Sequence, residues 1–322
     1  MAEKYSYPPT SEYLEAVVKP SVREQQKYFV NVLLFLGTVL TTLFWGAWMS
    51  LSFESSAGID LVRYVKLIIG QPTLLYRGAG YSFAILSILL AHEMGHYLAC
   101  CYYGIRATLP FFLPAPVYTG TFGAFIRIRS PFPNRRSLFD VGLAGPIAGF
   151  VVAIPFLWIG LKLSALVTVT SGQVSLGEPL IFKFFSKLLL LPAPAGKEYS
   201  LHPIAFAAWF ACLATSLNLL PIAQLDGGHV SYALFGKKAY YITWFFFSAV
   251  LGLAVYGFTR SYVAGMQWLF YSVLLLVLRW IAGFRHPATM DDDQEIGLAR
   301  KIWGGIALIV FIVTFMPVTI FS

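Results

Sequence analysis

The sequence predicts an all-α, polytopic membrane protein with about seven transmembrane helices and a small re-entrant β-hairpin. Its 322 residues are 58% hydrophobic and 12% charged, whereas soluble domains are roughly half apolar and a quarter charged. Apolar runs of about 20 residues, the length that crosses the hydrocarbon core of a bilayer, recur along the chain. One run also holds three ionisable side chains within five residues, which is costly in lipid and usually functional.

The candidate spans are the apolar runs that approach or exceed the length needed to cross a bilayer. A shorter apolar stretch with two lysines, 180–191, is too short to cross and predicts a helix lying at the membrane interface. The predicted spans are 29–52, 79–103, 138–162, 202–222, 239–258, 264–283 and 303–321.

These spans are predicted to form one membrane domain, 29–322, preceded by a cytoplasmic N-terminal arm, 1–28. The core of the domain is 79–236, with peripheral helices at 29–52 and 239–321. If the N-terminus is cytoplasmic, most lysines and arginines fall in loops on its side of the membrane. Because such loops are enriched in basic residues, we expect a cytoplasmic N-terminus.

The formal net charge of +8 is assigned to those loops, so no nucleic-acid partner is expected. The first long apolar run begins near Phe29 and is long enough to span, which argues against a cleavable signal peptide. The four glutamates that precede it are unlike an organelle transit peptide. The expectation is a multi-pass protein of a prokaryotic plasma membrane.

The second span contains His92-Glu93-Met94-Gly95-His96, an H-E-x-x-H pattern. On a helix, positions i and i+4 lie on one face, so both imidazoles can bind one metal ion. Zinc accepts two histidines and leaves room for a third protein ligand and a water. Glu93 is placed to reach that water as a general base. The alternative is a pair of hydrogen-bonded structural histidines, which would place three ionisable groups in lipid for no functional reason.

A third ligand must come from elsewhere in the chain, because two histidines seldom complete a catalytic zinc site. Asp140, at the start of the third span, and Asp226, in "SLNLLPIAQLDGGHV" after the fourth, are the acidic candidates. Pro221 interrupts that apolar run, and broken backbone at membrane depth indicates a protein-lined or wet cavity. Asp226 is therefore the preferred ligand, and His229 is a weaker alternative.

The paired motifs H-E-M-G-H and N-L-L-P-I-A-Q-L-D-G resemble those of the site-2 proteases, which are zinc-dependent intramembrane metalloproteases. The resemblance covers about 79–236 and is to the PDZ-less bacterial and plastid-type members. It implies one Zn²⁺ per chain held by His92, His96 and Asp226, with Glu93 as catalytic base. By the same resemblance, Asn218 helps to hold the substrate or its oxyanion.

The stretch Thr121–Arg129, "TFGAFIRIR", alternates apolar and basic residues at its end, which is typical of a half-buried strand. Bracketed by glycines and Pro131, it could form a re-entrant hairpin whose free edge pairs with an unwound substrate. The alternative is a cytoplasmic loop whose arginines contact lipid headgroups. The residues expected to bind substrate are Phe122, Gly123, Ala124, Phe125 and Ile126.

Three further features have simpler interpretations. Gly145 and Gly149 have the small-xxx-small spacing that lets helices approach closely, so they are expected to serve packing. Lys237–Lys238 is expected to be a cytoplasmic anchor. The charged segment 285–295, "RHPATMDDDQE", is expected to be a solvated linker.

The expected function is that of a zinc-dependent intramembrane endopeptidase, which cleaves transmembrane segments of single-pass membrane proteins in the lipid bilayer. One alternative is a zinc-dependent membrane hydrolase of a non-peptide substrate. Another is a non-enzymatic transporter, which would predict polar residues along several spans. The sequence specifies neither the substrate nor the oligomeric state.

Overall fold

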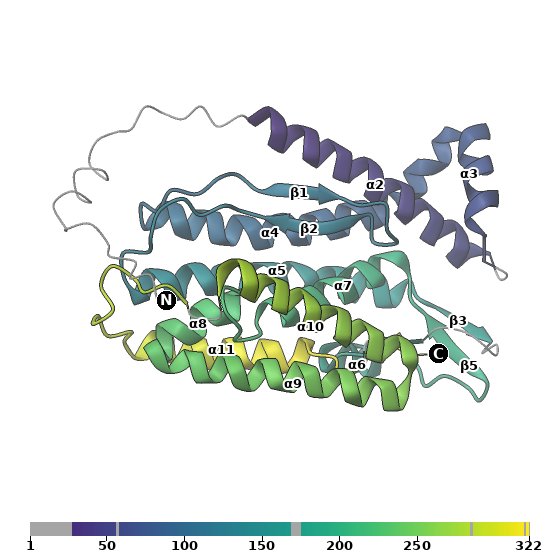
Figure 1. Ribbon diagram of the computed structural model, residues 1–322. Coiled ribbons are helices and arrows are strands. Elements are labelled where there is room, and N and C mark those ends of the chain that lie inside the picture. The colour runs from purple at the N-terminus through teal and green to yellow at the C-terminus, as the bar shows by residue number, and fades with distance from the viewer. Residues whose placement is uncertain (1–27, 56–57, 169–174, 284–285, 319, 322) are drawn as a thin grey trace.

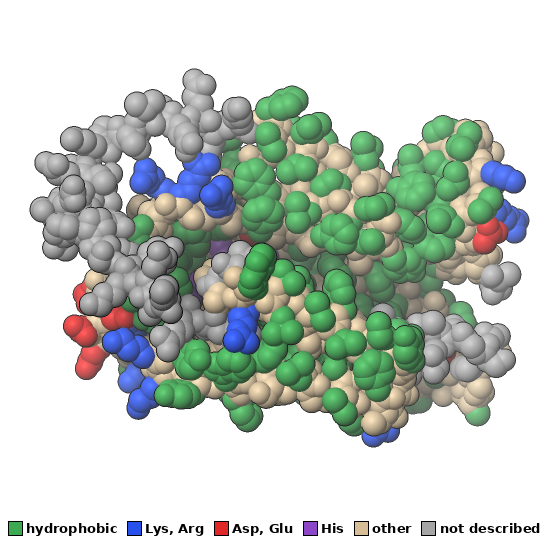
Figure 2. All heavy atoms as spheres, viewed as in Figure 1, with side chains coloured by type: hydrophobic (Ala, Val, Ile, Leu, Met, Phe, Trp, Pro, Cys, Tyr) green, Lys and Arg blue, Asp and Glu red, His purple; other side chains and the backbone are tan. Residues whose placement is uncertain are grey.

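The computed structural model describes residues 28–55, 58–168, 175–283, 286–318 and 320–321, so the predicted arm 1–28 falls almost entirely outside the described residues. Helices run side by side through most of the molecule (Figure 1). Hydrophobic side chains cover much of the visible face, while most charged side chains gather toward the helix ends (Figure 2). Four helices are long and apolar enough to cross a membrane: Tyr28–Glu54, Pro72–Tyr102, Arg135–Lys162 and Asp226–Arg260.

Each of the seven predicted spans overlaps one helix of the structure. These helices are α2 (Tyr28–Glu54), α4 (Ala79–Tyr102), α5 (Arg135–Lys162), α7 (Pro203–Asn218), α9 (Ala239–Arg260), α10 (Tyr262–Ala282) and α11 (Leu298–Thr314). The shorter helices are α3 (Leu61–Gly70), α6 (Leu180–Leu189) and α8 (Asp226–Phe235), with 3₁₀ turns η1 (Pro72–Gly78) and η2 (Gly236–Lys238). The structure thus supports a multi-pass helical membrane protein, while the number of crossings stays a prediction.

Local sequence explains where the helices nearest the site begin and end. Asn134 caps α5: its side chain accepts a hydrogen bond from the Ser137 N–H, and Ser137 bonds back to the Asn134 backbone. The fourth predicted span extends to 222, but α7 already ends at Asn218. Pro221 has no backbone N–H and disfavours helical geometry in the residue before it, so the chain leaves the helix here.

Three two-stranded antiparallel sheets complete the described fold: β1 (Phe111–Pro114) with β2 (Thr121–Phe125), β3 (Ala165–Thr168) with β5 (Lys197–Ser200), and β4 (Ser175–Leu176) with β6 (Ile320–Phe321). The predicted hairpin is therefore present, but its second strand ends at Phe125 instead of continuing to Arg129. Beyond that point the pairing is irregular, because Arg127 O accepts from Thr108 N–H and the Arg127 N–H donates to the Thr108 hydroxyl.

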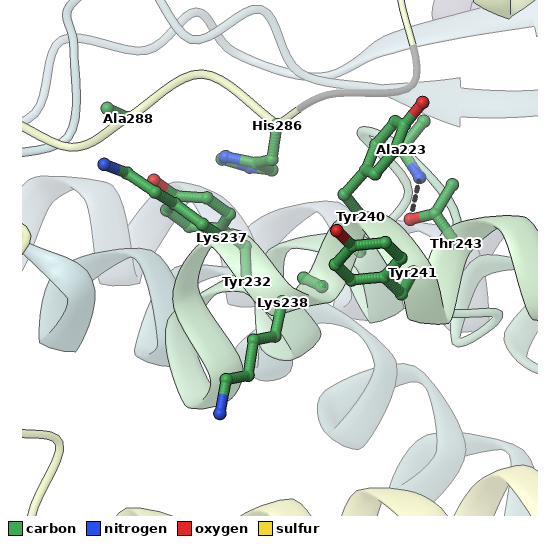
Figure 3. A pocket seen from close by; sticks show the side chains of 11 residues that line it. Ala223, Tyr232, Lys237, Lys238, Tyr240, Tyr241, Thr243, His286 and Ala288 are labelled. Carbon is green, nitrogen blue, oxygen red and sulfur yellow. Dashed lines mark hydrogen bonds between the residues drawn. The ribbon is translucent and has the colours of Figure 1, made fainter.

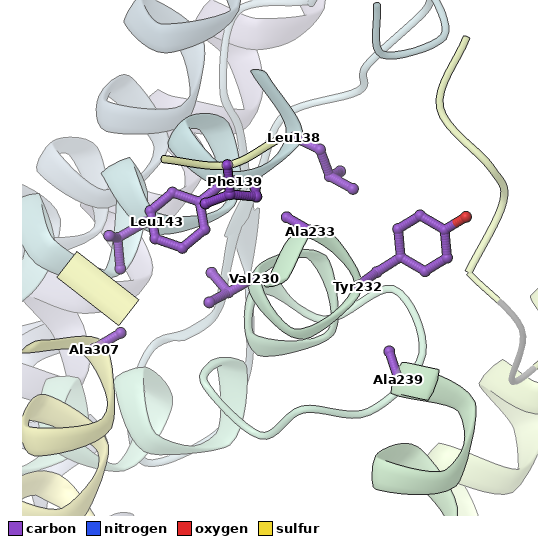
Figure 4. Close-up of a cluster of buried hydrophobic side chains, with 9 residues drawn as sticks. Leu138, Phe139, Leu143, Val230, Tyr232, Ala233, Ala239 and Ala307 are labelled. Carbon is purple, nitrogen blue, oxygen red and sulfur yellow. The ribbon is translucent and has the colours of Figure 1, made fainter. Parts of the chain in front are cut away.

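Helix α5 lies at the centre and packs against α4, α7 and α8. Close approach depends on small residues: a Cβ on Gly95 would lie 2.5 Å from the Ala144 carbonyl oxygen, and one on Gly160 would lie 2.2 Å from the Ala205 nitrogen. A cluster of buried apolar side chains joins α5, α8 and α11 (Figure 4). It contains Leu138, Phe139, Leu143, Val230, Tyr232, Ala233, Ala239, Ile296 and Ala307.

The predicted linker 285–295 lies within a segment, 286–297 among the described residues, that we call the strap. The strap is hydrogen-bonded to the start of α5, to the residues before it and to α8. Met290 N–H and Asp291 N–H donate to the carbonyls of Phe132 and Pro133, both at 3.0 Å. Arg136 Nε donates to the Glu295 carbonyl at 2.6 Å. Most residues of the strap are exposed, as predicted, but the strap is attached to the fold. The sequence did not reveal this attachment, because the bonds involve backbone groups and long basic side chains, which leave no periodic signal.

Candidate active site

Helix α4 places the two histidines of the H-E-x-x-H pattern on one face. The His92 and His96 side chains are buried, with 8% and 7% of each residue exposed, and their Nε2 atoms lie 3.2 Å apart. Two imidazole nitrogens that point at the same spot from consecutive turns are suited to bind one divalent cation.

Asp226, the first residue of α8, faces this pair. Its Oδ2 lies 3.3 Å from His92 Nε2, and its Oδ1 lies 3.3 Å from His96 Nε2. One donor atom from each of the three residues falls within 4.8 Å of the others, so the group could hold a metal ion. Two imidazoles and a carboxylate match the nitrogen and oxygen ligands of a catalytic zinc site. The structure therefore brings together the three predicted ligands.

A non-helical turn between α7 and α8 delivers Asp226 to the histidines. Within it, Ala223 has a positive φ of 49°, a left-handed backbone conformation that residues other than glycine rarely adopt. The two residues after Asp226 fit only as glycines, because a Cβ on Gly227 would lie 2.0 Å from the Leu219 carbonyl oxygen and one on Gly228 2.1 Å from that of Ala223. The Asp-Gly-Gly sequence thus folds α8 back against its own turn.

Helix α5 packs against the His92 and His96 rings. A Cβ on Gly145 would lie 2.1 Å from His96 Nε2, and one on Gly149 would lie 3.1 Å from His92 Cβ. The two glycines therefore leave room for the imidazole rings, in addition to the close packing expected of them. The matching four-residue spacings of the glycine and histidine pairs are the sequence signal that could have revealed this role.

The tautomer of His96 is set by α5. His96 Nδ1–H donates to the Val141 carbonyl at 2.7 Å, which leaves the Nε2 lone pair directed toward Asp226 and His92. Metal-binding histidines commonly use their second nitrogen in this way. Sequence reasoning did not identify Val141, because a backbone acceptor carries no residue-type signal.

Glu93 and Asn218 border the same cluster. Glu93 is buried, with 6% exposed, and its carboxylate accepts a hydrogen bond from the backbone N–H of Ile126. Asn218, the last residue of α7, has its side-chain amide 3.5 Å from His92 Nε2. A carboxylate and an amide thus flank the three candidate ligands.

The hairpin strand β2 ends one residue before Ile126, whose N–H donates to Glu93. Phe122 and Phe125 are exposed, Gly123 and Ala124 are half-buried, and Ile126 follows the end of the strand. On its other side β2 pairs with β1, which packs on α2. Among described strands, β2 pairs with β1 alone, so its second edge has no strand partner.

The two rejected ligand candidates are engaged elsewhere. Asp140 forms an ion pair with Arg300 of α11, at 2.8 Å and 2.7 Å, and accepts a hydrogen bond from the Tyr103 hydroxyl. His229 Nδ1 lies 2.6 Å from Nε2 of His286 in the strap. Neither belongs to the group of three donors around Asp226.

Comparison with known proteins agrees with a zinc site formed by the three candidate ligands. The Peptidase family M50 pattern matches residues 80–253, which include every residue of the cluster. The chain is 32% identical over 245 residues to a protein of Arabidopsis thaliana named as a probable zinc metalloprotease, EGY1, chloroplastic, covering 74% of this chain and 42% of the relative.

Two other relatives extend the comparison. The protein of the same description from Oryza sativa subsp. japonica is 28% identical over 321 residues, covering 94% of this chain and 52% of the relative. The Arabidopsis EGY2 protein, also named as a probable chloroplastic zinc metalloprotease, is 32% identical over 217 residues, covering 66% and 37%. The chain thus spans about half the length, or less, of these curated relatives.

Proposed function

Because the chain belongs to peptidase family M50, the site-2 proteases, we propose that it is a zinc-dependent intramembrane endopeptidase. The observation that carries the proposal is the convergence of His92, His96 and Asp226 from two helices, with Glu93 beside them. The substrates proposed are the transmembrane segments of single-pass membrane proteins. No observation in the described structure favours a non-peptide hydrolase or a transporter.

His92 Nε2, His96 Nε2 and one Asp226 oxygen would hold one Zn²⁺ per chain. When bound in such a site, zinc supplies a water of lowered pKa and polarises a carbonyl oxygen. The Val141 carbonyl and the two α5 glycines keep the imidazoles in the orientation that this requires.

Glu93 is the proposed general base. Its carboxylate takes the proton of the attacking water and returns it to the leaving amine, a role that requires hydrogen-bond reach of both. Asn218 is proposed to hold the substrate carbonyl as charge develops on its oxygen, with its amide N–H groups as donors. Its position 3.5 Å from His92 supports this role.

The proposed substrate-binding element is the second edge of β2, formed by residues 122–126. A helical substrate protects its peptide bonds in its own hydrogen-bond ladder, so it must unwind before cleavage. Pairing with a strand edge would hold the unwound segment through its backbone and would tolerate varied side chains. The hydrogen bond from the Ile126 N–H to Glu93 supports this role, since it joins the end of the edge to the proposed base.

We further propose seven membrane crossings in a single domain, 29–322, with the core at 79–236 and the N-terminus in the cytoplasm. Seven helices that overlap the predicted spans support this arrangement. The prokaryotic plasma membrane stays a prediction, and the relatives named above are described as chloroplastic.

The proposal is tested with the full chain in proteoliposomes and a single-pass substrate. We expect about one zinc per chain by elemental analysis, cleavage within the membrane segment, loss of cleavage with a chelator, and recovery on adding Zn²⁺. Metal-free protein that cleaves the substrate equally well would disprove the zinc dependence.

A further inference from the structure

Behind the turn that precedes Asp226, the structure contains a cavity that the proposed reaction does not use. It has a volume of about 500 Å³ and lies where α8, η2 and α9 meet the strap (Figure 3). Its lining consists mainly of aromatic, hydroxyl-bearing and basic side chains. Among them are Tyr232, Lys237, Lys238, Tyr240, Tyr241 and His286.

The charged side chains that line this cavity are all positive. Two lysines line it, and its described lining includes no aspartate or glutamate. Within the described part of the chain, neither Lys237 nor Lys238 belongs to a salt bridge. Figure 3 shows Lys237 extending beside the Tyr232 ring toward Ala288, and Lys238 extending away from His286. A cavity whose described lining contains basic side chains and no carboxylate is suited to an anion.

One wall of the cavity is held rigid. The rings of Tyr232 and His286 stack with centroids 4.6 Å apart and planes at 23°, and the Tyr232 hydroxyl donates to Asp292 Oδ2 at 2.7 Å. The Thr289 hydroxyl binds the other oxygen of that carboxylate, also at 2.7 Å. Both oxygens of the Asp292 carboxylate are therefore held by hydroxyl donors, and the wall is formed before any ligand arrives.

The floor of the cavity is formed by backbone on both sides of Asp226. Ala223 and Gly228 line it, and Thr243 ties the floor to α9 by donating to the Pro221 carbonyl at 3.2 Å and accepting from the Ala223 N–H at 3.4 Å. A ligand in the cavity would thus touch the backbone on either side of the proposed metal ligand.

The position of the cavity indicates the kind of anion. It lies at the start of α9, within the candidate span Asp226–Arg260, and exposed Tyr241 beside two lysines is the composition found at membrane–water interfaces. Phosphate is the anionic group that is concentrated at such an interface. We propose that this cavity binds the phosphate group of a phosphate ester at the membrane surface. The proposal goes beyond the proteolytic function and does not depend on it.

The proposal predicts saturable binding of an anionic phospholipid by the full chain. The protein is placed in phosphatidylcholine nanodiscs with increasing phosphatidylglycerol, and lipid retention is measured by native mass spectrometry. We expect the Lys237→Gln/Lys238→Gln variant to bind phosphatidylglycerol about 30-fold more weakly, since each lysine near an anionic surface contributes roughly a fivefold effect. Inorganic phosphate is added as a competitor. Displacement shows that the site recognises the phosphate group by itself, so that a soluble phosphate ester would also bind, whereas no displacement shows that binding requires the lipid headgroup.

Two further variants distinguish a built site from general surface charge. Lys66→Gln/Lys183→Gln removes the same charge from exposed positions outside the cavity and should bind within twofold of the unmodified chain. Ala288→Trp fills the cavity without changing charge and should weaken binding at least tenfold. Undiminished binding by the Lys237/Lys238 variant, equal loss in the Lys66/Lys183 control, or unchanged binding by Ala288→Trp would each overturn the proposal.

Discussion

Gly145 and His96 face each other so closely that a Cβ on the glycine would lie 2.1 Å from the imidazole Nε2. Because that distance is far below van der Waals contact, any larger residue at 145 must displace either the ring or α5. The space beside the proposed metal ligand is therefore fixed by the helix that packs against it.

Gly145→Ala is expected to reduce zinc affinity at least tenfold, because it misdirects His96, and loss of outer-shell support typically costs 10- to 100-fold. Zinc content is measured against a series of chelator concentrations. Gly252→Ala in α9, where no atom lies within 4 Å of the added Cβ, is the matched control and should retain zinc. Normal zinc affinity in Gly145→Ala would contradict this geometry.

Glu93→Gln is expected to lower the cleavage rate by about 10²- to 10⁴-fold, because the amide cannot accept the proton of the attacking water. The variant should still bind zinc, since Glu93 lies outside the group of three donors. Rates are measured in proteoliposomes and zinc by elemental analysis of the same samples. Loss of zinc together with activity would assign Glu93 to the metal instead.

Asp226→Asn and Asp140→Asn separate the two acidic candidates. Asp226→Asn should lose zinc and cleavage together, because an amide is a much weaker zinc ligand than a carboxylate. Asp140→Asn should keep zinc but lower the free energy of unfolding by about 1–3 kcal/mol, since it weakens charged hydrogen bonds to Arg300. Zinc loss in Asp140→Asn and not in Asp226→Asn would reverse the assignment.

Phe125→Pro is expected to abolish cleavage while leaving zinc bound, because proline removes a backbone donor and cannot continue a strand. Phe125→Ala keeps the backbone of β2 and serves as the control, with cleavage expected within tenfold of the unmodified chain. Cleavage and zinc content are compared for both variants. If Phe125→Pro cleaves normally, β2 does not present the substrate.

The free energy of unfolding should decrease as the pH falls, because the strap contains the half-buried histidine His286. Burial lowers the pKa of His286 below its usual value of about 6.5. As the pH falls below about 6.5, the unfolded chain therefore takes up this proton before the folded chain does, and the free energy of unfolding decreases. The melting temperature between pH 7.5 and 5 should fall less in His286→Phe than in the unmodified chain. An equal fall in both proteins would show that His286 is not responsible.

The parts of the fold that depend on composition and local pattern were predictable. Apolar runs located the seven helices that overlap the predicted spans. The stretch Thr121–Arg129 does contain a hairpin strand, but the strand ends at Phe125, before the alternating residues 126–129 on which the prediction was based. The H-E-x-x-H and Asp-Gly motifs selected residues that the fold brings within 3.3 Å of one another. These signals are strong because lipid and metal geometry each restrict the residue types that fit.

The features that were missed depend on contacts between distant backbone groups. The strap is held through carbonyls of Phe132 and Pro133, and the tautomer of His96 through that of Val141. A carbonyl is present at every position, so no residue type marks the one that is used. The cavity behind Asp226 also escaped prediction, since it forms only where the strap residues His286 and Ala288 pack over the stretch 223–243.

The ion pair between Asp140 and Arg300 connects α11 to the part of α5 that contacts His96. Asp140 is followed directly by Val141, whose carbonyl holds the ring of His96. Any displacement of α11 would therefore be transmitted to the histidine across a single peptide unit. Helix α11, the last helix in the described part of the chain, is thereby linked to a proposed metal ligand that lies about 200 residues earlier in the sequence.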